Sequence, residues 1–159
     1  MSSDISETHY APTQSMAKLA SLASEGAQLL REQGLNTNET VLVYRGMSGV
    51  SFATAVGLAL GGSSVGFAYI RKDGEDSHGF EVEYRGRVGQ WKNFVFVDDF
   101  VSSGETFRAC RDKMIESFGQ LKNVGEIGSW KSLTFRFGEV KLAELSDLEY
   151  TWDKPLSEV

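Results

Sequence analysis

The stretch FVFVDDFVSSGET, Phe94 to Thr106, joins an apolar run to two carboxylates and then to a turn rich in hydroxyl groups. Its first four residues are aromatic or β-branched, which is typical of a parallel strand buried on both faces. Asp98 and Asp99 come where that strand ends. In open α/β sheets, ligands bind beyond the carboxyl ends of the strands. The stretch therefore predicts both an α/β fold and a ligand site at one edge of its sheet.

Small and hydroxyl-bearing residues follow the acid pair and begin a segment with helical spacing: Ser102, Ser103, Gly104 and Thr106. Free N–H groups at the start of a helix attract anions, and the helix dipole adds to that attraction. This order indicates a site for a sugar phosphate, with the carboxylates on sugar hydroxyls or a metal and the turn on phosphate. The alternative is a buried strand that ends in a solvated acid pair and a serine-rich cap. The number of positions in this order favours the ligand site.

Helix and strand patterns alternate along the rest of the chain. Apolar residues at helical spacing predict helices at about 14–33 and 48–60, and Phe107, Cys110, Met114 and Phe118 predict a third. Further strands are expected at 41–44, 64–70, about 80–85 and 124–130. Strands that alternate with helices predict a mostly parallel central sheet flanked by helices.

Length, charge and cysteine content limit the functional classes. The 159 residues suffice for one domain with a core, and the net charge of -6 argues against general binding to nucleic acid. Cys110 is the only cysteine, so no internal disulfide forms. The polar start of the sequence and the lack of an apolar run of ~20 residues argue against membrane insertion. We therefore expect a soluble, cytoplasmic, single-domain protein.

Two other polar segments follow predicted strands, so they should meet the acid pair at the same edge of the sheet. They are YRGMSG, residues 44–49, and RKDGEDSHG, residues 71–79. A plain strand-to-helix turn with Ser48 as N-cap has the same residues as the first segment. A solvated loop accounts equally well for the charges of the second. Neither segment decides the function by itself.

Together the three segments resemble the type I phosphoribosyltransferases. FVFVDDFVSSGET resembles the family's motif for phosphoribosyl pyrophosphate (PRPP) at every position. YRGMSG is similar to its pyrophosphate-binding loop, and RKDGEDSHG resembles its mobile loop, most closely that of the orotate-using branch. The resemblance covers about half of the chain, roughly residues 41–118. It implies transfer of ribose 5-phosphate from PRPP to a purine or pyrimidine base, with release of pyrophosphate and with Mg²⁺ as cofactor.

The resemblance also implies roles for particular residues. Asp98 and Asp99 would hold the ribose hydroxyls, stabilise positive charge at the anomeric carbon and contact Mg²⁺ mainly through water. The residues that would bind the 5′-phosphate are Ser102, Ser103, Gly104, Glu105 and Thr106, where Glu105 contributes only its backbone. Those that would bind pyrophosphate through backbone amides are Arg45, Gly46, Met47 and Ser48. The mobile loop would add Arg71, Lys72 and His78 as the pyrophosphate leaves.

The sequence departs from the family in two respects. Gly74, Glu75 and Asp76 stand where the orotate-using enzymes have a further lysine, and acidic residues there would oppose pyrophosphate. The chain is also short, which leaves residues 1–34 and 131–159 as the candidates for a small hood around a core at about 41–130. A second hypothesis is therefore a non-catalytic regulatory protein that binds PRPP or a nucleotide. Related enzymes share loops between subunits, so a homodimer is compatible with either hypothesis.

Overall fold

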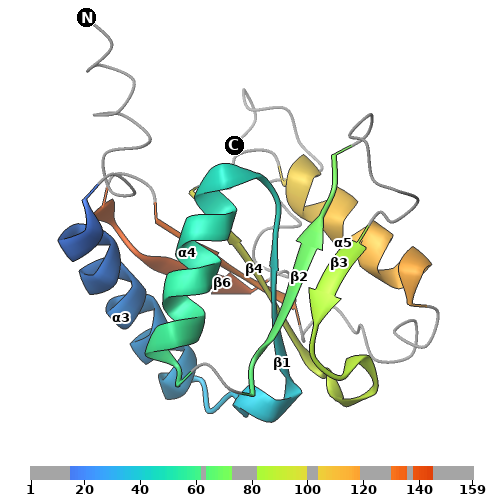
Figure 1. Ribbon diagram of the computed structural model, residues 1–159, viewed down its shortest axis with the longest axis horizontal. Coiled ribbons are helices and arrows are strands. Elements are labelled where there is room, and N and C mark those ends of the chain that lie inside the picture. The colour runs from blue at the N-terminus through green and yellow to red at the C-terminus, as the bar shows by residue number, and fades with distance from the viewer. Residues whose placement is uncertain are drawn as a thin grey trace, which may run out of the picture.

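The central sheet has six strands in the order β3-β2-β1-β4-β5-β6 (Figure 1). The computed structural model describes residues 15–61, 64–72, 82–99, 104–118, 130–135 and 138–144. The strand bounds are β1 Thr40–Tyr44, β2 Gly66–Ile70, β3 Val82–Arg85, β4 Asn93–Asp98, β5 Trp130–Thr134 and β6 Lys141–Glu144. Strands β2, β1, β4 and β5 run parallel, whereas β3 and β6 pair antiparallel at the two edges. The predicted mostly parallel sheet is confirmed.

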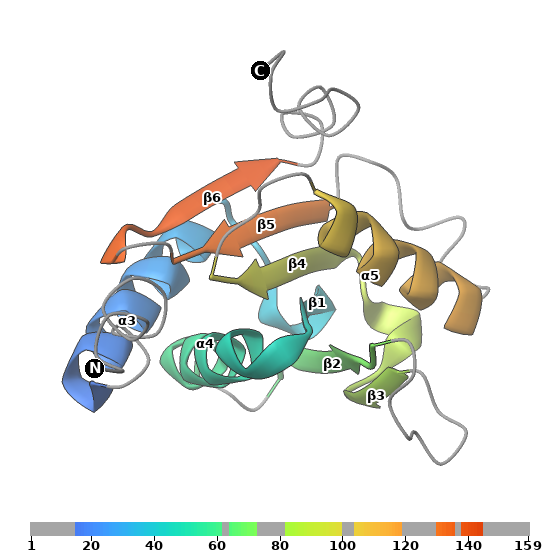
Figure 2. The same cartoon turned by 90° about the horizontal axis from the view of Figure 1, so that it is seen from above.

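Helices cover both faces of this sheet (Figure 2). Helices α3 (Met16–Glu32) and α4 (Gly46–Ala59) lie on one face, and α5 (Glu105–Ser117) lies on the other. Each face has its own apolar cluster, and the central strands supply both. In β4, Val95 and Val97 pack towards α3 and α4, while Phe94 and Phe96 pack towards α5. This burial on both sides explains the uninterrupted apolar run of β4.

The predicted stripe on the third helix is confirmed. Phe107, Cys110 and Met114 are fully buried, and Phe118 packs against them at the end of the helix.

Among the described helices, none is long and apolar enough to cross a membrane.

The start of α4 lies very close to the sheet because Gly49 has no side chain. A Cβ atom at Gly49 would lie 3.1 Å from the Cβ atom of Tyr44 and 3.1 Å from the carbonyl oxygen of Val97. These two atoms belong to the ends of β1 and β4, so any larger residue would push the helix away from both strands. Gly49 thus fixes the first turn of α4 beside the residues that follow β4.

Two expectations about the later part of the chain are corrected. The last parallel strand is β5, at Trp130–Thr134, and of the predicted strand at 124–130 only Trp130 lies within the described residues. Strands β5 and β6 extend the central sheet, so the described part of residues 131–159 belongs to the core and not to a hood. Similarly, α3 packs into the core through Leu19, Leu22 and Leu30. The remainder of the two hood candidates, residues 1–14 and 145–159, lies outside the described residues.

Candidate functional site

A cavity of about 300 Å³ lies at the carboxyl ends of the parallel strands. Four elements or their flanking segments contribute to it: the start of α4, the segment after β2, the end of β4 and the first turn of α5. Its lining residues are Arg45, Gly46, Met47, Ser48, Lys72, Asp98, Asp99 and Thr106. Eight of the predicted site residues, from all three predicted segments, therefore surround one space.

The acid pair forms the first wall of this cavity. Asp98 is the last residue of β4, and both carboxylates are half-buried. The Asp99 N–H donates to Asp98 Oδ1 at 2.8 Å, and the Asp99 carbonyl accepts from Phe135 N at 3.0 Å. Burial, followed by the hydrogen bond and the charge of Asp99, raises the pKa of Asp98 to about 8, against a smaller lowering by Lys72. Without a ligand, the acid pair therefore tends to retain a proton at neutral pH.

The first turn of α4 forms a second wall. The helix was expected to begin near Ser48 and instead begins at Gly46, with Arg45 as its N-cap in an extended conformation. Gly46 has φ +83°, a left-handed value that residues with a Cβ atom adopt only at a cost. Ser48 is buried within the turn and is not the N-cap. The backbone N–H groups at Gly46, Met47 and Ser48 have no partner within the helix, which suits them to an anion.

The start of α5 forms a third wall. Gly104 is buried, with φ +80°, and stands at the N-cap of the helix, where its carbonyl accepts from Arg108 N at 2.9 Å. Thr106 and Glu105, in the first turn, are both exposed, and Thr106 lines the cavity. Ser102 and Ser103, which were also predicted to bind phosphate, lie outside the described residues.

The segment after β2 only partly follows the prediction. Lys72 lines the cavity, but Arg71 does not; its guanidinium pairs with Glu83 on β3. The contact joins the two strands that flank the predicted mobile loop. His78, Gly74, Glu75 and Asp76 lie outside the described residues.

The side chain of Arg45 bonds to the end of β2. Arg45 Nη2 donates to the Arg71 carbonyl at 2.8 Å, and Arg45 Nε donates to the Ile70 carbonyl at 3.3 Å. Lys113 Nζ, from α5, donates to the same Arg71 carbonyl at 3.3 Å. Lys113 could not be predicted as a site residue from the sequence, because no motif contains it and its partner lies 42 residues away. One sequence feature could have pointed to Lys113. It lies three residues after the buried Cys110, and residues at this spacing are neighbours on a helix surface.

The acid pair suits one kind of metal site. Mg²⁺ is commonly held by one or two carboxylates together with substrate phosphates and water, so Asp98 and Asp99 fit it as contributors and not as a complete cage. Among the described residues, no group of three or more His, Cys, Asp or Glu side chains could hold a metal ion. The donor set therefore fits Mg²⁺ that arrives with a phosphorylated ligand.

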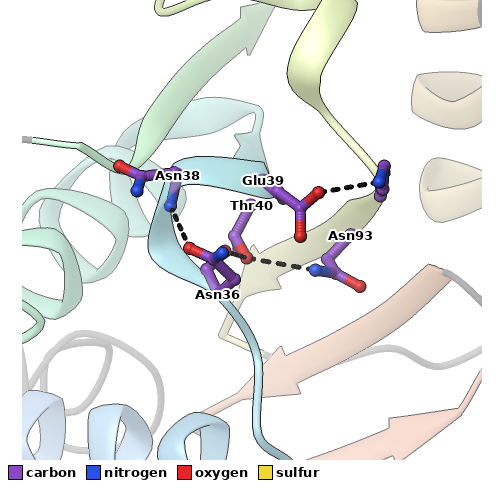
Figure 3. Close-up of polar contacts among 6 residues, drawn as sticks. Asn36, Asn38, Glu39, Thr40 and Asn93 are labelled. Carbon is purple, nitrogen blue, oxygen red and sulfur yellow. Dashed lines mark hydrogen bonds and ion pairs between the residues drawn. The ribbon is translucent and has the colours of Figure 1, made fainter.

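A larger hollow, of about 790 Å³, lies at the opposite edge of the sheet, beside the amino ends of the parallel strands. Figure 3 shows that the polar residues at this edge bond to one another. Asn36 Oδ1 accepts from Asn38 N at 3.0 Å, and the hydroxyl of the buried Thr40 donates to the Asn36 carbonyl at 2.7 Å. Glu39 pairs with Lys92 at 2.9 Å. These contacts hold the ends of β1 and β4 together and indicate a structural role.

Comparison with solved structures identifies the fold. The orotate phosphoribosyltransferase of Francisella tularensis matches with a TM-score of 0.50 and 18% identity over 89% of this chain and 65% of that enzyme. The chain has the type I phosphoribosyltransferase fold. It spans less than two thirds of the orotate enzyme. No protein-family model and no curated protein matches the sequence.

Two further structures are similar to a smaller degree. The UMP synthase of Leishmania donovani matches with a TM-score of 0.47 and 22% identity over 77% of this chain and 23% of that protein. The adenine phosphoribosyltransferase of Trypanosoma brucei, solved with AMP, pyrophosphate and ribose-5-phosphate, matches with a TM-score of 0.44 and 18% identity. The match covers 67% of this chain and 49% of that enzyme.

Proposed function

We propose that this protein is a phosphoribosyltransferase that transfers ribose 5-phosphate from PRPP to a nitrogenous base and releases pyrophosphate. The observation that carries the proposal is the cavity in which the acid pair, the first turn of α4, Lys72 and Thr106 meet. This combination suits a phosphorylated sugar, because its hydroxyls can donate hydrogen bonds to carboxylates. Its phosphates can accept hydrogen bonds from backbone amides and pair with cationic side chains.

Each wall would bind one part of PRPP. The N–H groups of Gly46 to Ser48 would bind the pyrophosphate, and the start of α5, at Gly104 and Thr106, would bind the 5′-phosphate. Ser102 and Ser103 would complete the phosphate turn. Asp98 and Asp99 would accept hydrogen bonds from the ribose hydroxyls. Bound Mg²⁺ would neutralise charge on the pyrophosphate as it leaves.

The reaction would then depend on positioning and electrostatics. The bond between the anomeric carbon and the pyrophosphate oxygen breaks, a bond from that carbon to a base nitrogen forms, and the nitrogen's proton passes to solvent. The carboxylates would stabilise the positive charge that develops on the ribose ring. Lys72, with Arg71 and His78 from the mobile loop, would stabilise the negative charge on the leaving group.

One observation favours the second candidate, a regulatory protein that binds PRPP or a nucleotide without turnover. Arg71 pairs with Glu83 and does not line the cavity. A catalytic loop would need to release this contact to bring the guanidinium to pyrophosphate. The homodimer remains a prediction for either candidate.

Calorimetric titration with PRPP and Mg²⁺ tests the shared site. We expect binding by the parent protein and a loss of about 100-fold or more in affinity for the Asp98→Asn, Asp99→Asn double variant, because both contacts to the ribose are removed. Asp112→Asn, an exposed acid on α5, is the matched control and should bind as the parent does. No heat with the parent protein would exclude both candidates.

Incubation of labelled PRPP with a panel of purine and pyrimidine bases separates the two candidates. Pyrophosphate release that depends on one base would establish the transferase. Tight binding without release in the presence of any base would establish the regulatory protein instead.

A further inference from the structure

The carbonyl group of Arg71 accepts hydrogen bonds from two cationic side chains that come from different elements. Arg45, at the start of α4, donates at 2.8 Å, and Lys113, in the second half of α5, donates at 3.3 Å. Each donor is charged, so each bond is stronger than one between neutral groups. The contact with the neighbouring Ile70 carbonyl gives Arg45 a second point of attachment to the end of β2.

The hydrogen bonds to the Arg71 carbonyl restrain the whole peptide unit between Arg71 and Lys72. The peptide unit is planar, so a held Arg71 carbonyl also sets the direction of the Lys72 N–H and the position of the Lys72 Cα atom. Lys72 is the residue of this segment that lines the cavity. The contacts on Arg71 therefore act on the placement of Lys72.

The same carbonyl connects three walls of the cavity. Arg45 is the N-cap of α4, whose first turn forms one wall, and Lys113 belongs to α5, whose first turn contributes Thr106 to another. Lys72 belongs to the segment after β2, which also lines the cavity. The three segments come from distant parts of the sequence, and this junction joins them through one carbonyl group.

The thiol of Cys110 lies within electrostatic reach of this junction. Burial raises the pKa of Cys110 to about 11, while Arg45 and Lys113 act to lower it and Asp98 acts to raise it. Arg45, Lys113 and Asp98 therefore all lie near one fully buried side chain. The thiol itself is inert at neutral pH.

We propose that Lys113 is a positioning residue that acts together with Arg45 to hold the Arg71–Lys72 peptide, and so keeps Lys72 directed at the pyrophosphate of PRPP. This inference rests on the proposed function. It differs from a purely structural role, in which Lys113 would only attach α5 to the sheet and its loss would lower stability without affecting the affinity for PRPP.

The first experiment needs no ligand. Hydrogen exchange of the amides at residues 71 and 72 is compared between the parent, Lys113→Met, Lys113→Arg and Lys92→Met. Methionine keeps most of the apolar stem of Lys113 but removes the donor, and Lys92 is a matched lysine with its own ion pair at the far edge of the sheet. We expect faster exchange in Lys113→Met alone. Unchanged exchange in that variant would overturn the proposal.

The second experiment measures the affinity for PRPP with Mg²⁺ and the melting temperature of the same four proteins. We expect the Kd of Lys113→Met to rise about tenfold, and Lys113→Arg to restore it to within about threefold, since arginine retains a charged donor. A Kd that stays at the parental value while exchange accelerates would leave only the structural role and overturn the proposal. Absence of binding by the parent would defeat the proposed function, while the exchange measurement would still decide whether Lys113 holds the peptide.

Discussion

The two edges of the sheet both carry clusters of polar residues, but they use them differently. At the amino edge, the residues around Asn36, Thr40 and Asn93 bond to one another and connect β1 to β4 (Figure 3). At the carboxyl edge, Asp98 and Asp99 lie side by side, and burial raises the pKa of Asp98 to about 8. The hollow at the amino edge is the larger of the two. In this protein the raised pKa of Asp98, and not the larger volume, coincides with the predicted site residues.

The largest change in stability is expected for Asp98→Asn. The carboxyl group titrates near pH 3.8 when exposed but near pH 8 in the folded protein, so folding is favoured below the lower value and loses stability as pH rises through this window. Asparagine does not ionise, so the variant does not lose this stability as pH rises. We expect the variant's melting temperature to exceed the parent's by about 3 °C or more at pH 8.5, with the difference shrinking towards pH 5.

Thermal unfolding at several pH values measures this difference, and Asp112→Asn serves as the control. A melting temperature at pH 8.5 equal to or below the parent's would show that Asp98 is not strained by burial. A gain in stability together with a loss of PRPP affinity is the pattern expected where a site sacrifices stability for function.

The next largest effect is expected for Gly49→Val. The added Cβ atom would meet Tyr44 and the Val97 carbonyl at 3.1 Å, so α4 would move away from β1 and β4. We expect a loss of about 2–3 kcal/mol in stability and weaker binding of PRPP, because the first turn of α4 moves with the helix. Gly89→Val, at the amino edge, is the matched control, since a Cβ atom there has open space. Chemical denaturation and calorimetry measure both effects. Equal stability of the two variants would contradict the close approach of α4 to the sheet.

A smaller effect, confined to stability, is expected for Thr40→Val. The buried hydroxyl donates to the Asn36 carbonyl at 2.7 Å, and its removal leaves that oxygen without this donor. We expect a loss of about 1–2 kcal/mol with a PRPP affinity unchanged within about twofold. Thr37→Val, whose hydroxyl makes an exposed contact with Ser64, should cost less. A marked change in PRPP affinity would mean that the amino edge is not merely structural.

The sequence was sufficient to predict the parts of the molecule that depend on local pattern. The apolar runs of β1 and β4 and the helical spacing of Phe107, Cys110 and Met114 follow directly from burial. Strand β5 was harder, because Lys131 and Ser132 interrupt its apolar pattern although both are buried. Lys131 is tolerated there by its ion pair with Glu144 on β6, a partner that only the sheet register brings close.

The residues of the candidate site also fall into two groups, those that the sequence could predict and those that it could not. Asp98, Asp99, Thr106 and Lys72 could be found because each follows the end of a strand or begins a helix, where parallel topology gathers them. The Arg71–Glu83 pair and the convergence of Arg45 and Lys113 on one carbonyl could not. These contacts join residues that are distant in sequence, and neither their periodicity nor their residue type distinguishes them from solvated charges.

The smallest effect is expected for Glu39→Gln. Its partner Lys92 has a raised pKa because Glu39 accepts a hydrogen bond from it and adds a negative charge nearby. A lysine whose pKa rises on folding contributes stability that is complete below its usual value of 10.5 and is lost only above it, so the contribution is constant between pH 7 and 9. The ammonium group is exposed, and water screens the pair. We therefore expect the melting temperature at pH 8 to change by less than about 1 °C, with or without added salt. A clear decrease that salt abolishes would mean that the ion pair stabilises the amino edge, and charge alone would then no longer distinguish the two edges of the sheet.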